Sequence, residues 1–392
     1  MRFNLWEDCN RVPLTELLSF IVDNRGKTVP TAPSGHKLIA TNCVTNNTLF
    51  PVYEKIRYLS EETYQTWFRA HPIPGDILFV NKGTPGRVCL VPDPVDFCIA
   101  QDMIALRADE SKIYPKYLFA VLRSREIQQQ IYNTNVGDVI PHFKKQFLNQ
   151  LLIPIPERSI QESIGDLYYV LSLKAERNKK INDNLQQQAM ALYAEMFLNS
   201  SDNNVTSGTL SDIAVITMGQ SPSGNSYNED GVGEVFYQGR AEFGFRFPKR
   251  RLFTTEPKRM AETGDVLLSV RAPVGDLNVA YESCCIGRGL GAIHSKTGHS
   301  SFVLYTMFAL KSQLDVFNGE GTVFGSINRD ALNAIPIDVP LVTKIDRFEA
   351  VAHPIDELIR TNYEENCRLE AIRDSLLPKL MSGEIDVSAV QL

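Results

Sequence analysis

The chain has 392 residues, 43% of them hydrophobic, which at roughly 150 residues per domain predicts two to three domains with ordinary cores. This composition excludes a disordered, collagen-like or small disulfide-stapled protein. The formal net charge of −6, from 40 basic and 46 acidic side chains, excludes a wholly basic nucleic-acid binder but leaves room for local basic surfaces.

Two further features concern the environment of the protein. No stretch approaches the roughly 18 consecutive apolar residues of a membrane span, and the N-terminus lacks an apolar signal core. We therefore expect a soluble, intracellular protein. The seven cysteines include no C-x-x-C pair, which favours buried, reduced thiols over disulfides or a zinc site.

An internal repeat dominates the organisation of the chain. Residues 75–79 (GDILF) are matched by 264–268 (GDVLL), and residues 143–156 (FKKQFLNQLLIPIP) by 327–340 (INRDALNAIPIDVP). The chain is therefore predicted to contain two copies of one unit, each of about 190 residues, which is too long for a solenoid repeat. The polar stretch 199–208 is the predicted linker between the copies.

Most of each copy has the composition of strands and turns. Short apolar runs such as 77–80, 88–91 and 266–270 are separated by Gly, Pro, Asn and Asp. One short amphipathic helix is predicted at 117–130 in the first copy, and one at 302–314 in the second.

Each copy ends in a long helical pattern. A capping box, Ser159 with Glu162, predicts the start of the first helix, and Thr343 with Asp346 occupies the equivalent place in the second copy. Pro354 predicts a kink or break in the second helix, and Gly383 predicts its end.

Alternating three- and four-residue spacing along both helices predicts heptad seams that pair with each other. Asn178 and Asn362 are repeat-equivalent polar positions, which we expect to fix the register. The alternative, in which each helix packs only on its own domain, stays open. The predicted seam residues are Ile164, Leu167, Leu171, Asn178, Ile181, Leu185, Phe348, Ile355, Ile359, Asn362, Leu369 and Leu376.

Motifs that would indicate an enzyme are incomplete. The segment 26–28 (GKT) resembles the end of a phosphate-binding loop but lacks the required upstream glycine, and the chain has no Pro-Pro methyltransferase signature. Asp93 and Glu110 imitate the carboxylates of metal-dependent nucleases, but we interpret them as parts of two unrelated surface loops. No cofactor or metal is expected.

Basic and amide side chains concentrate beside the repeated segments. Lys82 and Arg271 occupy equivalent positions after equivalent strands, and Arg246 belongs to the wider basic set. Glycine lets a backbone approach a phosphate, while Arg can contact guanine bidentately. A solvated surface would carry similar charges, so charge alone leaves both interpretations open. The candidate DNA-binding residues are Lys27, Lys82, Arg87, His142, Lys144, Lys145, Arg240, Arg271, Arg288, Asn328 and Arg329.

The order of these motifs carries a family resemblance over nearly the whole chain. GDILFVNKGTPGRVCLVP, then IPHFKKQFLNQLLIPIPERSIQESIGD and a long helix, are repeated as GDVLLSVRAPVGD, SINRDALNAIPIDVP and a second helix. This pattern resembles the specificity subunit of a type I DNA restriction-modification enzyme. The resemblance implies an α+β fold with two mixed α/β target-recognition domains, related by duplication and separated by two long helices in an antiparallel coiled coil.

On this basis the expected divisions are recognition domain 1 at residues 1–156, spacer helix 1 at 157–200, recognition domain 2 at 201–340 and spacer helix 2 at 341–392. The resemblance implies that each domain reads half of a bipartite site in double-stranded DNA. It also implies that the helices set the spacer and dock two methyltransferase subunits, and that restriction subunits join through the assembled complex. The chain would then be a non-catalytic protein of the prokaryotic cytoplasm without a cofactor of its own.

Two other functions remain open at this point. One is a self-sufficient restriction or modification enzyme, and the other is a duplicated scaffold protein with no role on DNA. The missing methyltransferase and ATPase motifs disfavour the first, and the acidic net charge is the only feature that favours the second.

Overall fold

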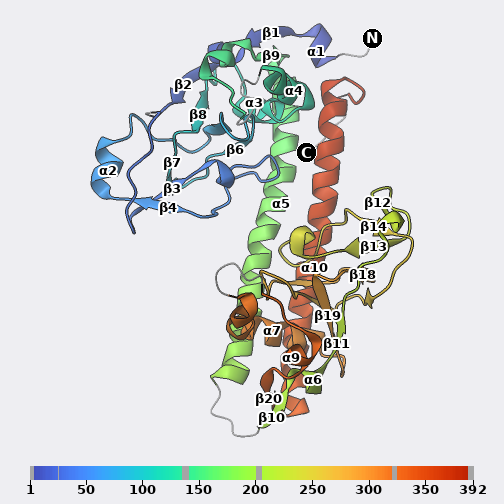
Figure 1. The fold of residues 1–392 in the computed structure, drawn as a ribbon. Helices are drawn as coiled ribbons and strands as arrows, with labels where there is room; N and C mark the ends of the chain where they lie inside the picture. Colours follow the sequence, from blue (N-terminus) through green and yellow to red (C-terminus); the bar gives the residue numbers. More distant parts are fainter. Residues whose placement is uncertain (1–3, 25, 135–140, 200–204, 320–324, 387–392) are drawn as a thin grey trace. The chain divides into compact units, whose positions relative to one another are not determined.

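The structure is a computed structural model that describes residues 4–24, 26–134, 141–199, 205–319 and 325–386. The chain divides into two units (Figure 1). The first consists of residues 1–180 and 362–392, and the second of residues 181–361. Each unit therefore contains one globular part and a stretch of each long helix.

The elements of the first copy are β1 Asn10–Pro13, β2 Leu18–Val22, β3 His36–Ile39, β4 Arg57–Leu59, β5 Ile77–Val80, β6 Val88–Leu90, β7 Phe97–Ile99, β8 Met103–Ala108, β9 Leu152–Ile155, α1 Leu5–Asp8, α2 Glu61–Thr66, α3 Pro115–Leu122, α4 Arg125–Thr134 and α5 Arg158–Tyr193. A π-helical turn at Ala194–Leu198 follows α5.

The elements of the second copy are β10 Val205–Thr209, β11 Ala214–Met218, β12 Tyr227–Asn228, β13 Glu234–Tyr237, β14 Phe253–Thr254, β15 Met260–Ala261, β16 Val266–Ser269, β17 Leu277–Val279, β18 Cys284–Ile286, β19 Leu290–Ser295, β20 Pro336–Pro340, α6 Leu210–Ile213, α7 Ser300–Ala309, α8 Lys311–Asp315, α9 Arg329–Asn333 and α10 Val342–Met381.

The two copies share one sheet topology. The first has an antiparallel sheet of order β2-β8-β5-β6, and the second repeats it as β11-β19-β16-β17. A second sheet in each copy contains one parallel pair, β3 with β7 and β13 with β18. The combination of mixed sheets with helices confirms the predicted α+β class.

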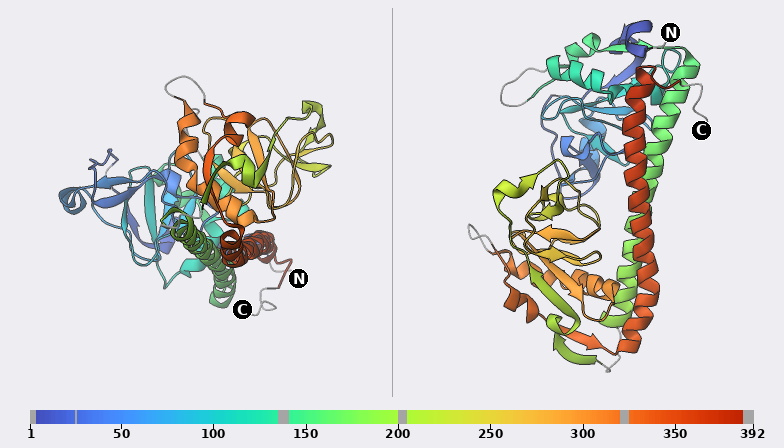
Figure 2. Two further views of the ribbon diagram at one scale, coloured as in Figure 1. Left: turned by 90° about the horizontal axis from the view of Figure 1, so that it is seen from below. Right: turned by 90° about the vertical axis from the view of Figure 1, so that its right-hand side faces the viewer.

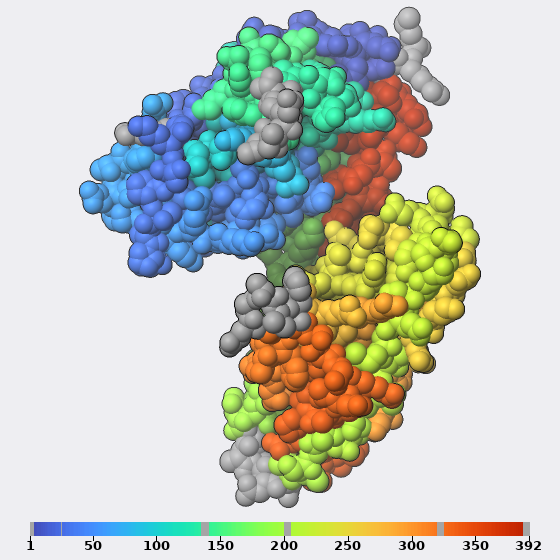
Figure 3. Space-filling view, viewed as in Figure 1, coloured from blue at the N-terminus to red at the C-terminus, as the bar shows by residue number. Residues whose placement is uncertain are grey.

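Beneath the surface that Figure 3 shows, buried apolar side chains form the core of each globular part. Strand β5 shows how its apolar run is used, because every residue in it is buried. Ile77 and Phe79 face the core shared with α3 and α4, whereas Leu78 and Val80 face a second cluster that includes Ile39. A strand with both faces covered needs such a continuous apolar sequence, since successive side chains point to opposite faces.

A stretch of α5 lies antiparallel to a stretch of α10 in each unit (Figure 2). In the first unit, Asn178 Nδ2 donates to Asn366 Oδ1 at 3.0 Å, and Ile164 lines the same small cavity as Leu380. In the second unit, Asn182 Nδ2 donates to the Ile359 carbonyl at 3.2 Å. The helices thus pair with each other and also pack on the globular parts.

The buried faces of the two helices have different periods. In α10 six buried residues lie seven positions apart, namely Ile345, Ala352, Ile359, Asn366, Arg373 and Leu380, and Phe348, Leu377 and Met381 are buried as well. In α5 the buried residues Gln161, Ile164, Tyr168, Ser172, Ala175, Asn178, Asn182, Ala189 and Tyr193 lie nearer the 3.6 residues per turn of a straight helix. The predicted seam residue Ile181 is consequently 44% exposed, and Asn182 is buried in its place.

The helix starts differ from the predicted capping boxes. Helix α5 begins at Arg158, and the Glu157 carbonyl accepts from the amides of Ile160 and Gln161. Glu162 accepts a hydrogen bond from Arg158, 2.9 Å away, and α10 similarly begins before Thr343. In both copies the helix starts as soon as the chain leaves the proline-containing strand, so the predicted cap already lies in its first turn.

Other predicted boundaries also change. The single helix predicted at 117–130 is two helices, α3 and α4, because Ser124 Oγ accepts from the Ile127 amide and starts a new helix. The helix predicted at 302–314 is likewise divided into α7 and α8. Within the predicted linker 199–208, residues 200–204 lie outside the described residues, and Val205–Thr209 forms β10.

Helix α10 is not broken at Pro354. Pro354 and Ala350 are both exposed, so water can hydrate the Ala350 carbonyl that loses its helical donor. The helix ends at Met381, and Gly383 has φ +68° as expected for a helix terminus.

No described helix is long and apolar enough to cross a membrane. Five cysteines are buried, Cys9 is partly buried and Cys367 is exposed, so the expectation of buried thiols fails for Cys367.

Candidate nucleic-acid interface

The turn after the central strand has the same backbone clamp in both copies. In the first copy, the Gly83 amide donates to the Pro141 carbonyl at 2.9 Å, and the Phe143 amide donates to Asn81 at 2.8 Å. In the second copy, the Ala272 amide donates to Gly325 and the Ile327 amide to Val270, both at 3.0 Å. We call residues 81–87 and 270–276 the exit turns.

The clamp brings predicted site residues together. Lys82 lies opposite His142, and Arg271 lies opposite Ser326, in equivalent antiparallel bridges. The repeated segments 75–79 and 143–156, which are far apart in the sequence, therefore meet at the exit turn of the first copy. Their counterparts meet in the second copy.

One glycine explains why each exit turn can close. Gly86 and Gly275 have φ of +89° and +96°, a conformation that L-residues with side chains rarely adopt. A Cβ atom on Gly86 would also lie 3.0 Å from Gln128 Oε1 and 3.2 Å from Ile131. The turn therefore packs closely on α4.

A buried aspartate precedes the central strand of each copy and anchors its start. Asp76 accepts from the Ile73 amide and from Arg107, whose Nε is 2.9 Å from Oδ1. In the second copy Asp265 accepts from the Glu262 amide, and its Oδ1 lies 2.6 Å from His294 Nδ1. Burial raises the pKa of Asp265, while the hydrogen bonds from Glu262 and His294 oppose that rise.

An open hollow of about 650 Å³ adjoins the exit turn of the second copy. It is lined by Met218, Val270, Arg271, Ala272, Arg288, Gly325, Ser326, Ile327 and Asn328. Arg271 and Arg288 are exposed, and within the described residues no carboxylate forms an ion pair with either. The Asn328 side-chain oxygen caps α9 by accepting a hydrogen bond from the Ala331 amide at 2.8 Å.

The first copy carries a different set of side chains on the same backbone. Lys82, Arg87 and Lys144 are exposed and make no ion pair with another described residue. Gln101 is the counterpart of Arg288. The Asn81 amide donates to the Asp102 carbonyl, just as the Val270 amide donates to the Gly289 carbonyl. Gln101 and Arg288 are the residues immediately before these two acceptors. Gln101 was not among the predicted site residues, although the repeated Cys98-Ile99 and Cys285-Ile286 would have indicated it.

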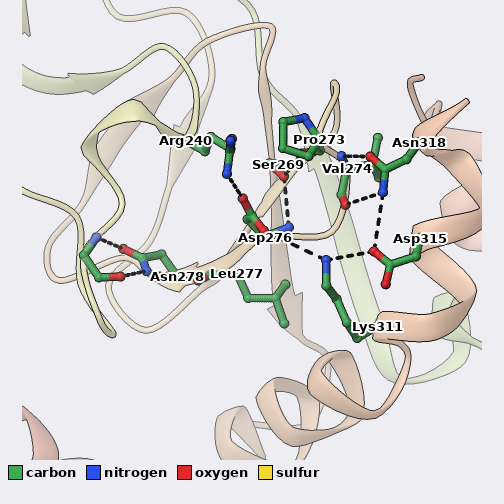
Figure 4. A network of polar contacts seen from close by, with 11 residues as sticks. Arg240, Ser269, Pro273, Val274, Asp276, Leu277, Asn278, Lys311, Asp315 and Asn318 are labelled. Atoms are coloured by element: carbon green, nitrogen blue, oxygen red, sulfur yellow. Dashed lines mark hydrogen bonds and ion pairs between the residues drawn. The ribbon is translucent and has the colours of Figure 1, made fainter. Parts of the chain in front are cut away.

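Some predicted residues already have partners or lie elsewhere. Lys145 forms an ion pair with Asp23, and Arg240 forms one with Asp276, which Lys311 also approaches (Figure 4). Lys27 and Arg329 are exposed, but Lys27 makes no contact that joins it to the exit turn among the described residues.

Arg246 was expected in the basic surface, but the structure contradicts this. Its side chain is only 4% exposed and forms an ion pair with Asp356 of α10 at 2.9 Å. Gln186 and Tyr305 accept further hydrogen bonds from its guanidinium. Arg246 therefore fastens the globular part of the second unit to the long helices.

Comparison with known proteins gives a consistent result. Residues 23–187 match the family described as the type I restriction modification DNA specificity domain. The chain is 28% identical over 357 residues to a protein named as the type I restriction enzyme MjaX specificity subunit of Methanocaldococcus jannaschii, covering 85% of this chain and 84% of that protein. It is 22% identical to the HindI specificity subunit of Haemophilus influenzae over 398 residues, covering 79% of this chain and 86% of the other.

Over most of its length the chain is similar to specificity subunits of type I restriction-modification systems. The crystal structure of a type I S subunit from M. genitalium has the same fold, with a TM-score of 0.62 and 16% identity over 97% of this chain and 98% of that one. The matching backbone hydrogen bonds and bridges make the two exit turns equivalent parts of the duplicated unit.

Proposed function

We propose that this specificity subunit reads a bipartite DNA site, with each copy contacting one half-site through its exit turn. The main support is that both copies place exposed cations on or beside the same clamped backbone, Lys82 and Arg87 in the first and Arg271 and Arg288 in the second, and none of them forms an ion pair with a described residue. Cations of this kind neutralise phosphates, and guanidinium groups can also bind guanine edges in the major groove.

Within this proposal the predicted residues have different roles. Arg271 and Arg288 share a hollow with Asn328 and are the candidates for base contacts. Lys82, Arg87 and Lys144 are candidates for phosphate contacts, and His142 lies beside them. Lys27, Lys145, Arg240 and Arg329 are proposed as peripheral contacts.

We further propose that the chain itself is non-catalytic and acts in the cytoplasm with its chromosomal target. In this proposal, α5 and α10 set the distance between half-sites and dock two methyltransferase subunits, and restriction subunits join through that complex. The domain boundaries at residues 156, 200 and 340 belong to the same proposal. A self-sufficient enzyme is distinguishable because the purified chain alone would then transfer methyl groups from S-adenosylmethionine to DNA.

Methylation mapping tests the central claim. Genomic DNA from cells with the gene should carry one bipartite methylated motif with a fixed spacer, and that motif should be absent without the gene. Purified chain should also bind duplex DNA with an affinity that falls as salt rises. An unchanged methylation map together with no duplex binding would favour a scaffold protein without a role on DNA.

The role of the helices needs a separate experiment. Lengthening α5 and α10 by one heptad each adds about 10 Å at 1.5 Å per residue, or roughly 3 bp along DNA. We expect the same two half-sequences with a longer spacer between them. An unchanged spacer would reject the helices as its determinant and leave DNA reading intact.

A further inference from the structure

The first unit contains an open hollow between its globular part and α5. It has a volume of about 330 Å³ and is lined by Phe50, Pro74, Gly75, Leu90, Val91, Pro92, Asp93, Glu110, Tyr114, Pro115, Lys116 and Tyr169. The sequence suggested that Asp93 and Glu110 belong to unrelated loops, but they line the same hollow. Aromatic residues and prolines are six of its twelve lining residues.

The second unit has the counterpart of this hollow. The Leu90 amide donates to the Leu49 carbonyl, and the Val279 amide donates to the Arg246 carbonyl, both at 2.8 Å. These equivalent hydrogen bonds align the loop after Leu49 with the loop after Arg246. Four equivalent pairs line both hollows: Phe50 and Phe247, Gly75 and Gly264, Leu90 and Val279, Tyr169 and His353. The duplication has therefore preserved one hollow in each copy.

The two hollows differ in how they are filled. The second has a volume of only about 60 Å³, and the chain's own Arg246 lies in its lining beside Asp356. The first has Leu49 in place of Arg246, and this leucine is buried in the core.

The acidic rim differs in the same way. Asp93 lies three residues after Leu90, and Glu282 lies three residues after Val279, the counterpart of Leu90. Glu282 accepts two hydrogen bonds from Arg250, at 2.5 and 2.7 Å, and Arg250 also lies over the Tyr281 ring. At the position of Arg250 the first unit has Tyr53, and within the described residues Asp93 has no basic partner.

Other charges around the first hollow are already balanced. Lys116 forms an ion pair with Asp166 at 2.6 Å, and Arg158 forms one with Glu162 at 2.9 Å. The Glu110 carboxylate, like that of Asp93, is exposed and makes no ion pair with a described residue. Lys116 also lies over the Tyr169 ring, and Arg158 donates to the Glu110 carbonyl. The Asp93 and Glu110 carboxylates are thus the acidic groups of the rim that no described cation pairs with.

We infer that the first hollow is a socket for an arginine side chain of a methyltransferase subunit, whereas the second hollow is filled by this chain itself. An arginine matches this surface, because its stem packs on aromatic and proline side chains while its guanidinium binds carboxylates and ring faces. The second copy supplies a precedent for the rim, since there Arg250 of the same chain binds Glu282, the counterpart of Asp93, while Arg246 lines the hollow itself. The inference rests on the proposed function and adds that the two docking sites are unequal.

The test uses the full-length chain and purified methyltransferase subunit of the same system, with sedimentation measuring both stoichiometry and affinity. In the variant Asp93→Lys with Glu110→Lys, we expect one of the two bound subunits to be lost, with at least a tenfold weaker affinity at that site. The milder variant Asp93→Asn with Glu110→Gln should weaken the same site less. Both carboxylates are exposed and form no ion pair with a described residue, so the fold should be unaffected; a thermal melt checks this.

Matched variants make the result specific. Glu62→Lys reverses an exposed charge elsewhere in the first unit and should leave both sites unchanged, as should Arg250→Ala in the second unit. Two subunits bound with wild-type affinity by the reversed variant, or equal weakening of both sites, would overturn the inference alone. If the wild-type chain binds duplex DNA but no methyltransferase, the proposed assembly fails together with this inference.

Discussion

The loop that joins each globular part to the long helices uses opposite chemistry in the two units. The first has Leu49 in an apolar core, and the second has Arg246 in a buried ion pair with Asp356. The position equivalent to Asp356 is Ser172, whose hydroxyl donates to Tyr168. The backbone carbonyls of Leu49 and Arg246 accept equivalent hydrogen bonds, from the Leu90 amide in the first unit and the Val279 amide in the second. The two copies thus share this backbone hydrogen bond, while the side chains at two equivalent positions, Leu49 and Ser172 or Arg246 and Asp356, differ together.

Replacing one member of the buried pair gives the largest expected effect. Arg246→Leu should reduce the free energy of unfolding of the second unit by about 3–5 kcal/mol, because it leaves the Asp356 carboxylate without its partner. Chemical denaturation, with hydrogen exchange reporting on residues 205–319, measures this loss. Adding Asp356→Ser recreates the Leu49 and Ser172 pair of the first unit and should restore most of the stability. A double variant as unstable as the single one would show that the two sides did not diverge as a pair.

The exit turns offer a comparison at the level of DNA reading. Arg271→Ala and Arg288→Ala should each cost about 1–3 kcal/mol of binding free energy and relax the specificity of one half-site only. Lys82→Ala and Lys144→Ala should weaken all sequences alike and lower the salt slope. Binding titrations on duplexes with single changes in either half-site separate these outcomes. Arg271→Lys is the matched control, since it keeps the charge and loses bidentate geometry. Equal loss on every sequence for Arg271→Ala would assign it to phosphate instead.

The sequence predicted those features that repeat or that depend on one residue's backbone preference. The duplication, the two long helices, the heptad of α10 and the end signal at Gly383 were all visible in it. It did not predict that α5 buries Asn182 where the heptad would bury Ile181, because the buried face depends on what packs against the helix. Nor did it predict that Arg246 is buried, since a basic residue in a loop has the same sequence signature whether or not Asp356 faces it. Asp93 and Glu110 meet only through the tertiary fold.

The buried aspartates give a smaller, pH-dependent comparison. Asp76 is paired with Arg107, which keeps its charge at all pH values studied in proteins, whereas Asp265 is paired with a histidine. Burial raises the pKa of Asp265 in the folded chain above its value in the unfolded chain. The stability that the protonated Asp265 contributes is therefore fully present at a pH below the unfolded-state pKa, and it is lost as the pH rises through the folded-state pKa. An asparagine at this position does not ionise, so Asp265→Asn removes this loss. The melting temperature of the variant minus that of the wild type should therefore increase between about pH 3 and pH 7. A difference that stays constant with pH would contradict the raised pKa.

The smallest expected effect concerns cations that already have partners. The exit turn of the first copy has Arg87 where the second has Asp276, and Asp276 holds Arg240. Because exposed ion pairs contribute little, and because DNA must compete with Asp276 for the guanidinium, Arg240→Ala should change DNA binding by less than about 1 kcal/mol. Asp276→Asn should instead strengthen binding to all sequences severalfold, since it frees Arg240 and removes a negative charge near the phosphates. Titrations at two salt concentrations measure both variants. An equal loss of binding for Arg240→Ala and Arg288→Ala would contradict this expectation. Ion pairing within the turn would then not determine which cations reach DNA, and the two copies would differ in DNA binding through geometry alone.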